Sequence, residues 1–233
     1  MDLYVLVNIG IVAAPLALSF DRRVAYYRRW AALGIAVSPV SAAYIAWDVF
    51  ATARGDWWFN KQYAGDPVLF SLPLGEVLFF VTVPYACLFI YEVVRAYFPR
   101  RTAPAPSPAR AIAFGLAAAL LLTAFMFRDR DYTVLALSSV AALLVLAALL
   151  DPEMPRSYHA GLFMLLSYVP FLIANGILTS LPIVGYNPDA IWGVRFLSIP
   201  LEDFFYNFGM LGFYLLVYRR VVRFRAGPAG ERT

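Results

Sequence analysis

The sequence predicts an all-α integral membrane protein with seven transmembrane helices, arranged as two parallel three-helix repeats joined by a linking helix. Three observations lead to this fold. Hydrophobic residues make up 62% of the 233 residues and charged residues only 15%, a composition far from that of a soluble domain. The apolar residues gather into seven stretches, each close to the roughly 20 residues that cross a bilayer core as a helix. The third observation is an internal similarity between the two halves of the chain.

The seven apolar stretches are expected to form the membrane spans. They cover residues 3–20, 31–50, 75–98, 111–127, 132–150, 159–181 and 203–222. The first stretch has no basic residues before it and no clear small-residue cleavage site, so we interpret it as a span rather than a secretory signal. The single Cys87 lies within a span, which excludes a disulfide inside one chain.

Lysine and arginine are retained in cytoplasmic loops, so their distribution predicts the orientation of the chain. With the N-terminus outside, fourteen basic residues fall on the cytoplasmic side and five on the outer side. The net charge of +4 therefore reflects membrane topology, and nucleic acid is not expected as a partner. We expect the protein in the inner cell membrane, in contact with lipid, with its C-terminus in the cytoplasm.

A shift of 127 residues places the first three expected spans on the last three, which indicates a tandem repeat. At this offset "SLPLGEVLFF" (71–80) aligns with "SIPLEDFFYN" (198–207), with serine, proline and leucine at matching positions. The lone middle span makes the two units parallel. The expected domains are residues 1–98 (first three-helix repeat), 99–129 (linker and connecting helix), 130–225 (second three-helix repeat) and 226–233 (disordered tail).

Three carboxylates, Glu76, Glu202 and Asp203, follow Pro73 and Pro200 at the expected starts of two spans. Acids in the first turn of a helix gain roughly 0.3 to 1 kcal/mol from the unpaired amides and the macrodipole, so they need no further function. An ionised carboxylate near the bilayer middle, however, costs about 2.5 to 3.5 kcal/mol on insertion scales and usually marks a site inside the bundle. The twofold recurrence of acids beside aromatic residues favours a site.

The doubled Pro-x-Glu-(Glu/Asp) pattern followed by aromatic residues, on two three-span units, resembles the membrane-integral lycopene cyclases. "IPLEDFFYN" carries the pattern intact, whereas "LPLGEVLFF" has Gly75 at the position of the first acid. The resemblance covers nearly the whole chain, and the length suggests the fused form of a family that also occurs as two-subunit enzymes. It implies that the ψ-ends of lycopene, or of a related lipid-soluble carotenoid, are cyclised to ionone rings, with β rings expected. No redox change, metal or cofactor is implied.

The implied reaction begins when a carboxylic acid protonates C2 of the polyene end, and it ends when a base removes a proton from C6 or C4. The resemblance implies Glu202 as the proton donor, Glu76 as its counterpart in the first repeat and Asp203 as partner or base, with acid and base roles open. Aromatic faces would hold the intermediate cation without trapping it as an alcohol. The expected substrate-binding residues are Phe79, Phe80, Phe204, Phe205, Tyr206, Asn207, Asn60 and Asn187.

Other interpretations of the sequence stay open. Trp57, Trp58 and Phe59 in a loop are more typical of an aromatic belt at the membrane surface than of a substrate contact. Asp48 and Asn175, related by the same offset, suit polar pairing between helices as well as a catalytic role. A carotenoid end-group hydratase would share the first protonation, and a proton- or ion-coupled transporter would use carboxylates at helix breaks. The sequence does not determine the ring type, the number of ends cyclised or the oligomeric state.

Overall fold

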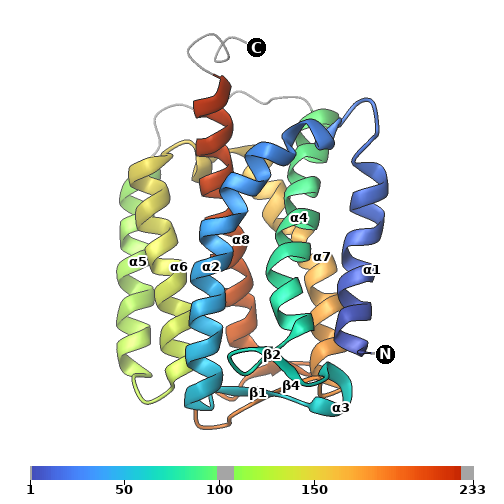
Figure 1. Cartoon of the computed structure of the whole chain (residues 1–233). Coiled ribbons are helices and arrows are strands. Elements are labelled where there is room, and N and C mark those ends of the chain that lie inside the picture. Colours follow the sequence, from blue (N-terminus) through green and yellow to red (C-terminus); the bar gives the residue numbers. More distant parts are fainter. Residues whose placement is uncertain (1, 99–107, 227–233) are drawn as a thin grey trace.

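Long helices form over all seven apolar stretches expected from the sequence (Figure 1). In the computed structural model, which describes residues 2–98 and 108–226, the largest differences from the expected ends are the extensions of α2 to Arg54 and of α8 to Ala226. The helices and 3-10 turns are α1 (Leu3–Leu18), η1 (Tyr26–Arg29), α2 (Trp30–Arg54), α3 (Lys61–Ala64), α4 (Leu74–Tyr97), α5 (Ala109–Met126), α6 (Asp131–Leu150), η2 (Met154–Arg156), α7 (Tyr158–Ser180) and α8 (Leu201–Ala226).

Five helices within the described residues are long and apolar enough to cross a membrane. They are α2 together with η1, α4, α5, α6 and α7. The helix α1 is apolar but has only 16 residues, and α8 carries acids in its first turn and arginines in its last. The protein is thus a helical membrane protein, and the count of seven spans stays a prediction. The expected linker over 99–107 and the tail from 227 onward lie outside the described residues.

Proline residues stand at the starts of α4 and α8, as the sequence predicts. Pro73 is the N-cap residue of α4, with φ −71° and ψ 159°, and Pro200 directly precedes α8. Proline suits this position because its φ is fixed and the first N–H groups of a helix have no partner within the helix. Glu76, Glu202 and Asp203 therefore lie in first turns.

Short strands join the loops at the end of the bundle where the N-terminus lies (Figure 1). The strands are β1 (Trp57–Phe59), β2 (Pro67–Leu69), β3 (Leu72–Pro73), β4 (Val184–Tyr186), β5 (Arg195–Phe196) and β6 (Ile199–Pro200). The antiparallel pair of β1 and β4 connects the loop after α2 to the loop after α7. The hairpin β2–β3 precedes α4 and the hairpin β5–β6 precedes α8, at positions related by the 127-residue shift. These strands are too short to give a sequence pattern, so the all-α prediction missed them.

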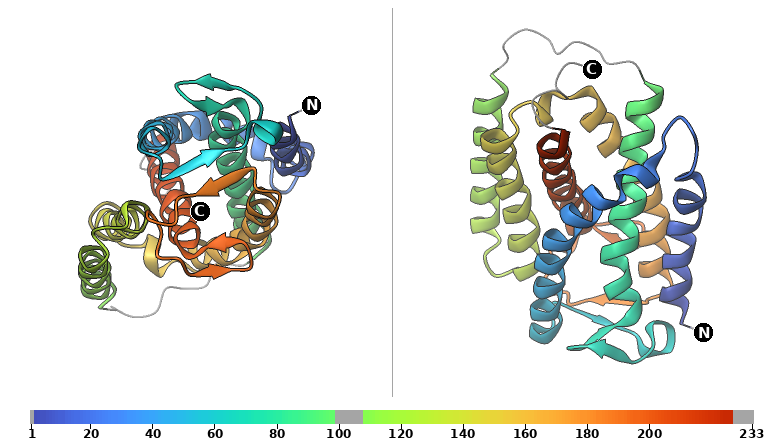
Figure 2. Two further views of the ribbon diagram at one scale, coloured as in Figure 1. Left: turned by 90° about the horizontal axis from the view of Figure 1, so that it is seen from below. Right: turned by 45° about the horizontal axis from the view of Figure 1, so that its top comes forward.

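Within the described residues, α8 lies at the centre of the bundle and α5 at its edge. The helix α8 contacts α2, α4, α6 and α7, whereas α5 packs mainly against α6. Seen from below, the α5–α6 pair stands to one side of the other helices (Figure 2). The connecting helix expected within 99–129 is therefore peripheral, and the division into two three-helix repeats stays a prediction.

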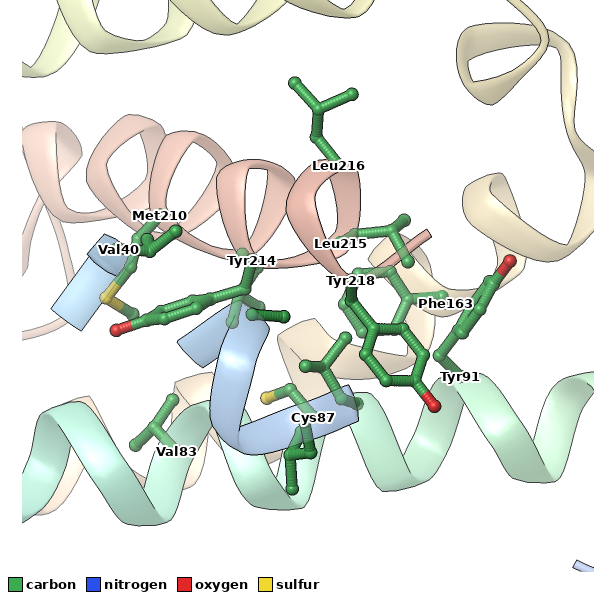
Figure 3. Packing of buried hydrophobic residues seen from close by; sticks show 14 of the residues in the cluster. Val40, Val83, Cys87, Tyr91, Phe163, Met210, Tyr214, Leu215, Leu216 and Tyr218 are labelled. Carbon is green, nitrogen blue, oxygen red and sulfur yellow. The ribbon is translucent and has the colours of Figure 1, made fainter. Parts of the chain in front are cut away.

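Tyrosines of α8 fill the main hydrophobic core (Figure 3). Tyr214 and Tyr218 are fully buried and lie between α8 and α4. The hydroxyl group of Tyr214 is 2.9 Å from that of Ser41, and the hydroxyl group of Tyr218 donates to Glu92 at 2.9 Å. Each ring thus contributes a large buried apolar surface while its polar tip keeps a partner.

The end of the bundle opposite the strands carries most of the arginines. There the buried Asp151, at the end of α6, accepts hydrogen bonds from Arg219 (2.6 Å) and Arg223 (3.0 Å) of α8. Two arginine partners compensate the burial of one carboxylate, and they fix the C-terminal part of α8 against α6. The arginine-rich end is the one that the sequence assigns to the cytoplasm, and the orientation itself stays a prediction.

Two glycines let α6 and α8 approach closely. A Cβ atom on Gly212 would overlap Cδ2 of Leu143, and one on Gly209 would lie 2.7 Å from Oγ of Ser139. Small residues are common where membrane helices meet, because close packing drives their association.

Gly212→Val is expected to destabilise the protein by about 1 to 3 kcal/mol, because the added side chain displaces Leu143 from a packed contact. Thermal unfolding of the purified protein in detergent, followed by circular dichroism, measures the loss. Gly115→Val in α5 is the matched control, since a Cβ atom there meets nothing within 4 Å. Equal melting temperatures for the two variants would contradict this account of α6–α8 packing.

Candidate active site

A cavity lies between the helix bundle and the β1–β4 strand pair. Every long helix except α5 contributes side chains to its wall in the described part of the chain. The cavity and its open mouth together contain about 560 Å³ of empty space. The wall is largely aromatic and carries three carboxyl groups. The lining residues are Tyr4, Asp48, Trp57, Phe59, Glu76, Phe79, Tyr132, Phe171, Asn175, Leu178, Val184, Tyr186, Asp203, Tyr206, Asn207 and Met210.

Asp203 accepts three hydrogen bonds inside this cavity. The hydroxyl groups of Tyr132 and Tyr186 donate to Oδ1 (2.7 Å) and Oδ2 (2.8 Å), and the amide group of Asn175 donates to Oδ2 at 3.2 Å. Burial first, and then the neighbouring Asp203, raise the pKa of Tyr186, a residue of the strand β4, well above its ordinary value. Tyr186 therefore keeps its proton at neutral pH and donates a hydrogen bond to Asp203. A carboxyl group whose two oxygens both accept hydrogen bonds is suited to act as a base.

Glu76 faces the same cavity from the first turn of α4. Its Oε2 atom accepts a hydrogen bond from the hydroxyl group of Tyr4 at 2.6 Å. The carboxyl group of Asp48, on α2, lines the same cavity and interacts with that of Glu76. Two carboxyl groups form a hydrogen bond only when one of them carries a proton, because a carboxylate is an acceptor only. The Glu76–Asp48 pair is therefore a place where the cavity can hold a carboxylic acid.

Glu202 is buried, with 2% of its surface exposed, but it does not line the cavity. Its Oε1 atom accepts hydrogen bonds from the hydroxyl group of Thr133 (2.5 Å) and from the backbone N–H of Trp192 (2.6 Å). Glu202 thus ties the loop that follows β4 to α6 and α8. Successive residues of a helix point about 100° apart, so only one of the two adjacent acids faces the cavity. That residue is Asp203.

The first motif has a glycine in place of the first acid for a structural reason. A Cβ atom on Gly75 would lie 2.5 Å from Cβ of Tyr4. The side chain of Asn8 also donates to the backbone carbonyl of Gly75 at 2.8 Å. The helix α1 therefore packs so closely against α4 that no larger residue fits, and the space is taken by the tyrosine that donates to Glu76.

The structure brings together five of the residues that the sequence predicts for the site. Glu76, Phe79, Asp203, Tyr206 and Asn207 all line the cavity. Asp203 and Asn207 are one helical turn apart, so they share a face of α8.

The other predicted residues lie outside the cavity wall. Phe80 is fully buried in the core, Phe204 stacks on Tyr168 of α7, and Phe205 packs against the smaller cluster around Trp57 and Tyr132. Asn60 and Asn187 hold loop structure: Asn60 caps α3 by accepting from the N–H of Gln62, and Asn187 donates to the carbonyl of Gly55.

Several cavity residues were not predicted from the sequence. Tyr4 and Tyr132 are 72 and 71 residues away in sequence from the carboxyl groups that accept their hydrogen bonds. No local pattern connects residues so far apart. Asp48 did give a signal, because it is an acid within an apolar stretch, but that signal did not separate polar pairing from a role in the site. Trp57 lines the cavity, in contrast to its interpretation as part of an aromatic belt.

The residues described here define a helical membrane protein in which acids from two parts of the chain converge on one aromatic cavity. Within the described residues, no group of three or more histidine, cysteine, aspartate or glutamate side chains is arranged to hold a metal ion. The family model for lycopene cyclase matches residues 1–94 and 129–221, most of the chain. The protein therefore belongs to the lycopene cyclase family, whose members are enzymes of carotenoid cyclisation in carotenoid biosynthesis. No curated protein and no solved structure matches the chain.

Glu202→Ala is expected to destabilise the protein by about 1 to 3 kcal/mol, because two buried donors lose their acceptor. Faster hydrogen–deuterium exchange in the loop that contains Trp192, together with a lower melting temperature, measures the effect. Glu153→Ala is the control, since that carboxylate is 78% exposed and pairs with Arg223 at the surface. An unchanged exchange rate in the loop would show that Glu202 does not hold it.

Proposed function

We propose that the protein is a lycopene cyclase that converts the ψ-ends of lycopene to β-ionone rings by an acid-initiated reaction without redox change. The observation that carries this proposal is the convergence of Glu76 and Asp203, from the two motifs, on one cavity with an aromatic wall. Family membership supplies the class of reaction, and the contacts of each carboxyl group suggest its part in it.

In the proposed mechanism, Glu76 delivers the first proton. A hydrogen bond between its carboxyl group and that of Asp48 requires a proton between the two, so this pair can supply the acid that the reaction needs. The O–H bond of Glu76 breaks, and the electron pair of the terminal C1–C2 double bond takes the proton at C2. The positive charge then lies on the tertiary carbon C1. This is general acid catalysis by a desolvated carboxyl group.

The cation is next consumed by ring closure inside an aromatic wall. The C5–C6 double bond attacks C1, and the charge moves to C5. Tyr206 and Trp57 of the cavity wall can stabilise the charge through their ring faces, by roughly 0.5 to 2 kcal/mol each when desolvated. The hydroxyl groups of Tyr132 and Tyr186 donate to Asp203, the proposed base of the last step.

Asp203 then acts as the base. It removes the proton from C6, the C–H electron pair forms the C5–C6 double bond of the β ring, and the product has the same composition as the substrate. The three donors around Asp203 hold its oxygens in place before the proton arrives. One proton leaves Glu76 and one reaches Asp203, so the cycle is complete once Asp203 releases its proton and Glu76 regains one.

This assignment differs from the one implied by the sequence in the identity of the donor. Glu202 was expected to deliver the proton, whereas its contacts with Thr133 and Trp192 suit a residue that holds the loop over the cavity. The 127-residue shift aligns Glu76 with Asp203, so the two proposed catalytic carboxyl groups occupy equivalent positions of the two motifs.

Glu76→Gln and Asp203→Asn are each expected to reduce ring formation by about 100-fold or more, because neither amide can exchange the proton. Glu202→Gln is expected to keep most of the activity, since its amide oxygen still accepts from Thr133 and Trp192. Each variant is expressed in a lycopene-accumulating host, and the pigments are separated into one-ring, two-ring and hydroxylated products. Immunoblots of the membrane fraction confirm equal accumulation.

Full activity of Glu76→Gln, with loss confined to Glu202→Gln, would overturn our assignment in favour of Glu202 as donor. Hydroxylated products from the wild-type protein would identify a carotenoid hydratase instead of a cyclase. Unchanged lycopene with ion-dependent solute uptake would identify a transporter.

A further inference from the structure

Asp48 is a third carboxyl group at the cavity, and in the proposed reaction it neither gives a proton to the substrate nor takes one from it. It lies in α2 with 2% of its surface exposed. Its Oδ1 atom accepts hydrogen bonds from Nε1 of Trp57 at 2.7 Å and from the hydroxyl group of Thr52 at 3.3 Å. In both contacts the partner is the donor, so Oδ1 is the acceptor.

The other oxygen of the Asp48 carboxyl group, Oδ2, has no such donor in the described chain. No N–H or O–H group among residues 2–98 and 108–226 donates to this atom. Nor does any lysine or arginine of these residues form an ion pair with Asp48 or Glu76. The carboxyl group of Glu76, which lines the same cavity, also interacts with that of Asp48. A buried acceptor without a donor is costly, and a proton on Glu76 removes that cost.

We propose that Asp48 is a positioning residue that keeps the transferable proton on Glu76 and directs that carboxyl group to the cavity. Trp57 and Thr52 donate hydrogen bonds to Asp48, which favours its ionised form. The proton that the two acids share therefore resides on Glu76. The hydroxyl group of Tyr4 approaches the other oxygen, Oε2, and leaves Oε1 to carry the proton. This inference rests on the proposed function of Glu76 as the proton donor.

The ionisable groups that face Glu76 come from four elements. Within the described residues, none of them forms an ion pair with Glu76. They are Tyr4 of α1, Asp48 of α2, Tyr186 of β4, and Asp203 and Tyr206 of α8.

The test is the pH dependence of ring formation by the purified enzyme in lipid vesicles loaded with lycopene. Activity requires protonated Glu76, so it falls as the pH rises. In Asp48→Asn the amide N–H donates to Glu76 and stabilises the carboxylate. We expect activity at pH 7 to fall by about tenfold or more and the pH of half-maximal activity to move down by about one unit, with partial recovery in acid.

Trp57→Phe tests the same contact in the opposite direction. It keeps an aromatic ring in the cavity wall but removes the donor to Asp48. Asp48 then competes more strongly for the shared proton, and the pair holds that proton to higher pH. We expect the alkaline fall in activity to move upward by about half a unit or more.

Glu92→Gln is the matched control for the loss of a buried carboxyl group. Glu92 lies in the same helix as Glu76 but at its other end, where Tyr218 and Arg95 donate to it. Its pH profile should equal that of the wild type. The proposal is overturned if Asp48→Asn keeps the wild-type pH profile, or if Asp48→Asn and Trp57→Phe shift it in the same direction. Full activity of Glu76→Gln would instead overturn the proposed function.

Discussion

The requirement that every buried carboxyl group find a proton or a donor governs the architecture around the cavity. A carboxylate removed from water without such a partner costs several kcal/mol, and the apolar surroundings of a membrane protein make this cost hard to avoid. The carboxyl groups differ in how they meet the requirement: hydroxyl and amide donors surround Asp203, an acid–acid contact joins Glu76 to Asp48, and a backbone N–H and a hydroxyl group donate to Oε1 of Glu202, whose Oε2 has no partner in the described residues. The three solutions imply three different tasks.

These contacts also explain why the loops fold as they do. The tyrosine that donates to Asp203 from β4 is placed by the pairing of Tyr186 with Trp57 in β1, and Trp57 itself donates to Asp48. One strand pair therefore serves a carboxyl group from each half of the chain. The loops over the cavity are part of the site, and they supply polar groups that the apolar helices lack.

The sequence was sufficient to predict the helices, because apolar stretches of about 20 residues and the proline residues before α4 and α8 are local signals. It also identified the acids in the first turns. It could not rank Glu202 against Asp203, since adjacent positions differ only in the direction they face, and that depends on how α8 is rotated against its neighbours. Tyr4 and Tyr132 escaped prediction for the same reason: their partners are distant in sequence and meet them only through packing. For Asp48 the sequence left polar pairing and a catalytic role open.

The convergence of both halves on a single cavity has a consequence for a molecule with two identical termini. In the proposed mechanism Glu76 and Asp203, which line one cavity, act on the same terminus, so the two halves cannot each process their own end at the same time. For the proposed substrate, the second terminus must therefore be presented in a separate visit, after the first product has withdrawn and reversed its direction in the bilayer. Release of a half-finished intermediate is then built into the turnover, and the balance between escape and return decides how symmetric the final pigment becomes.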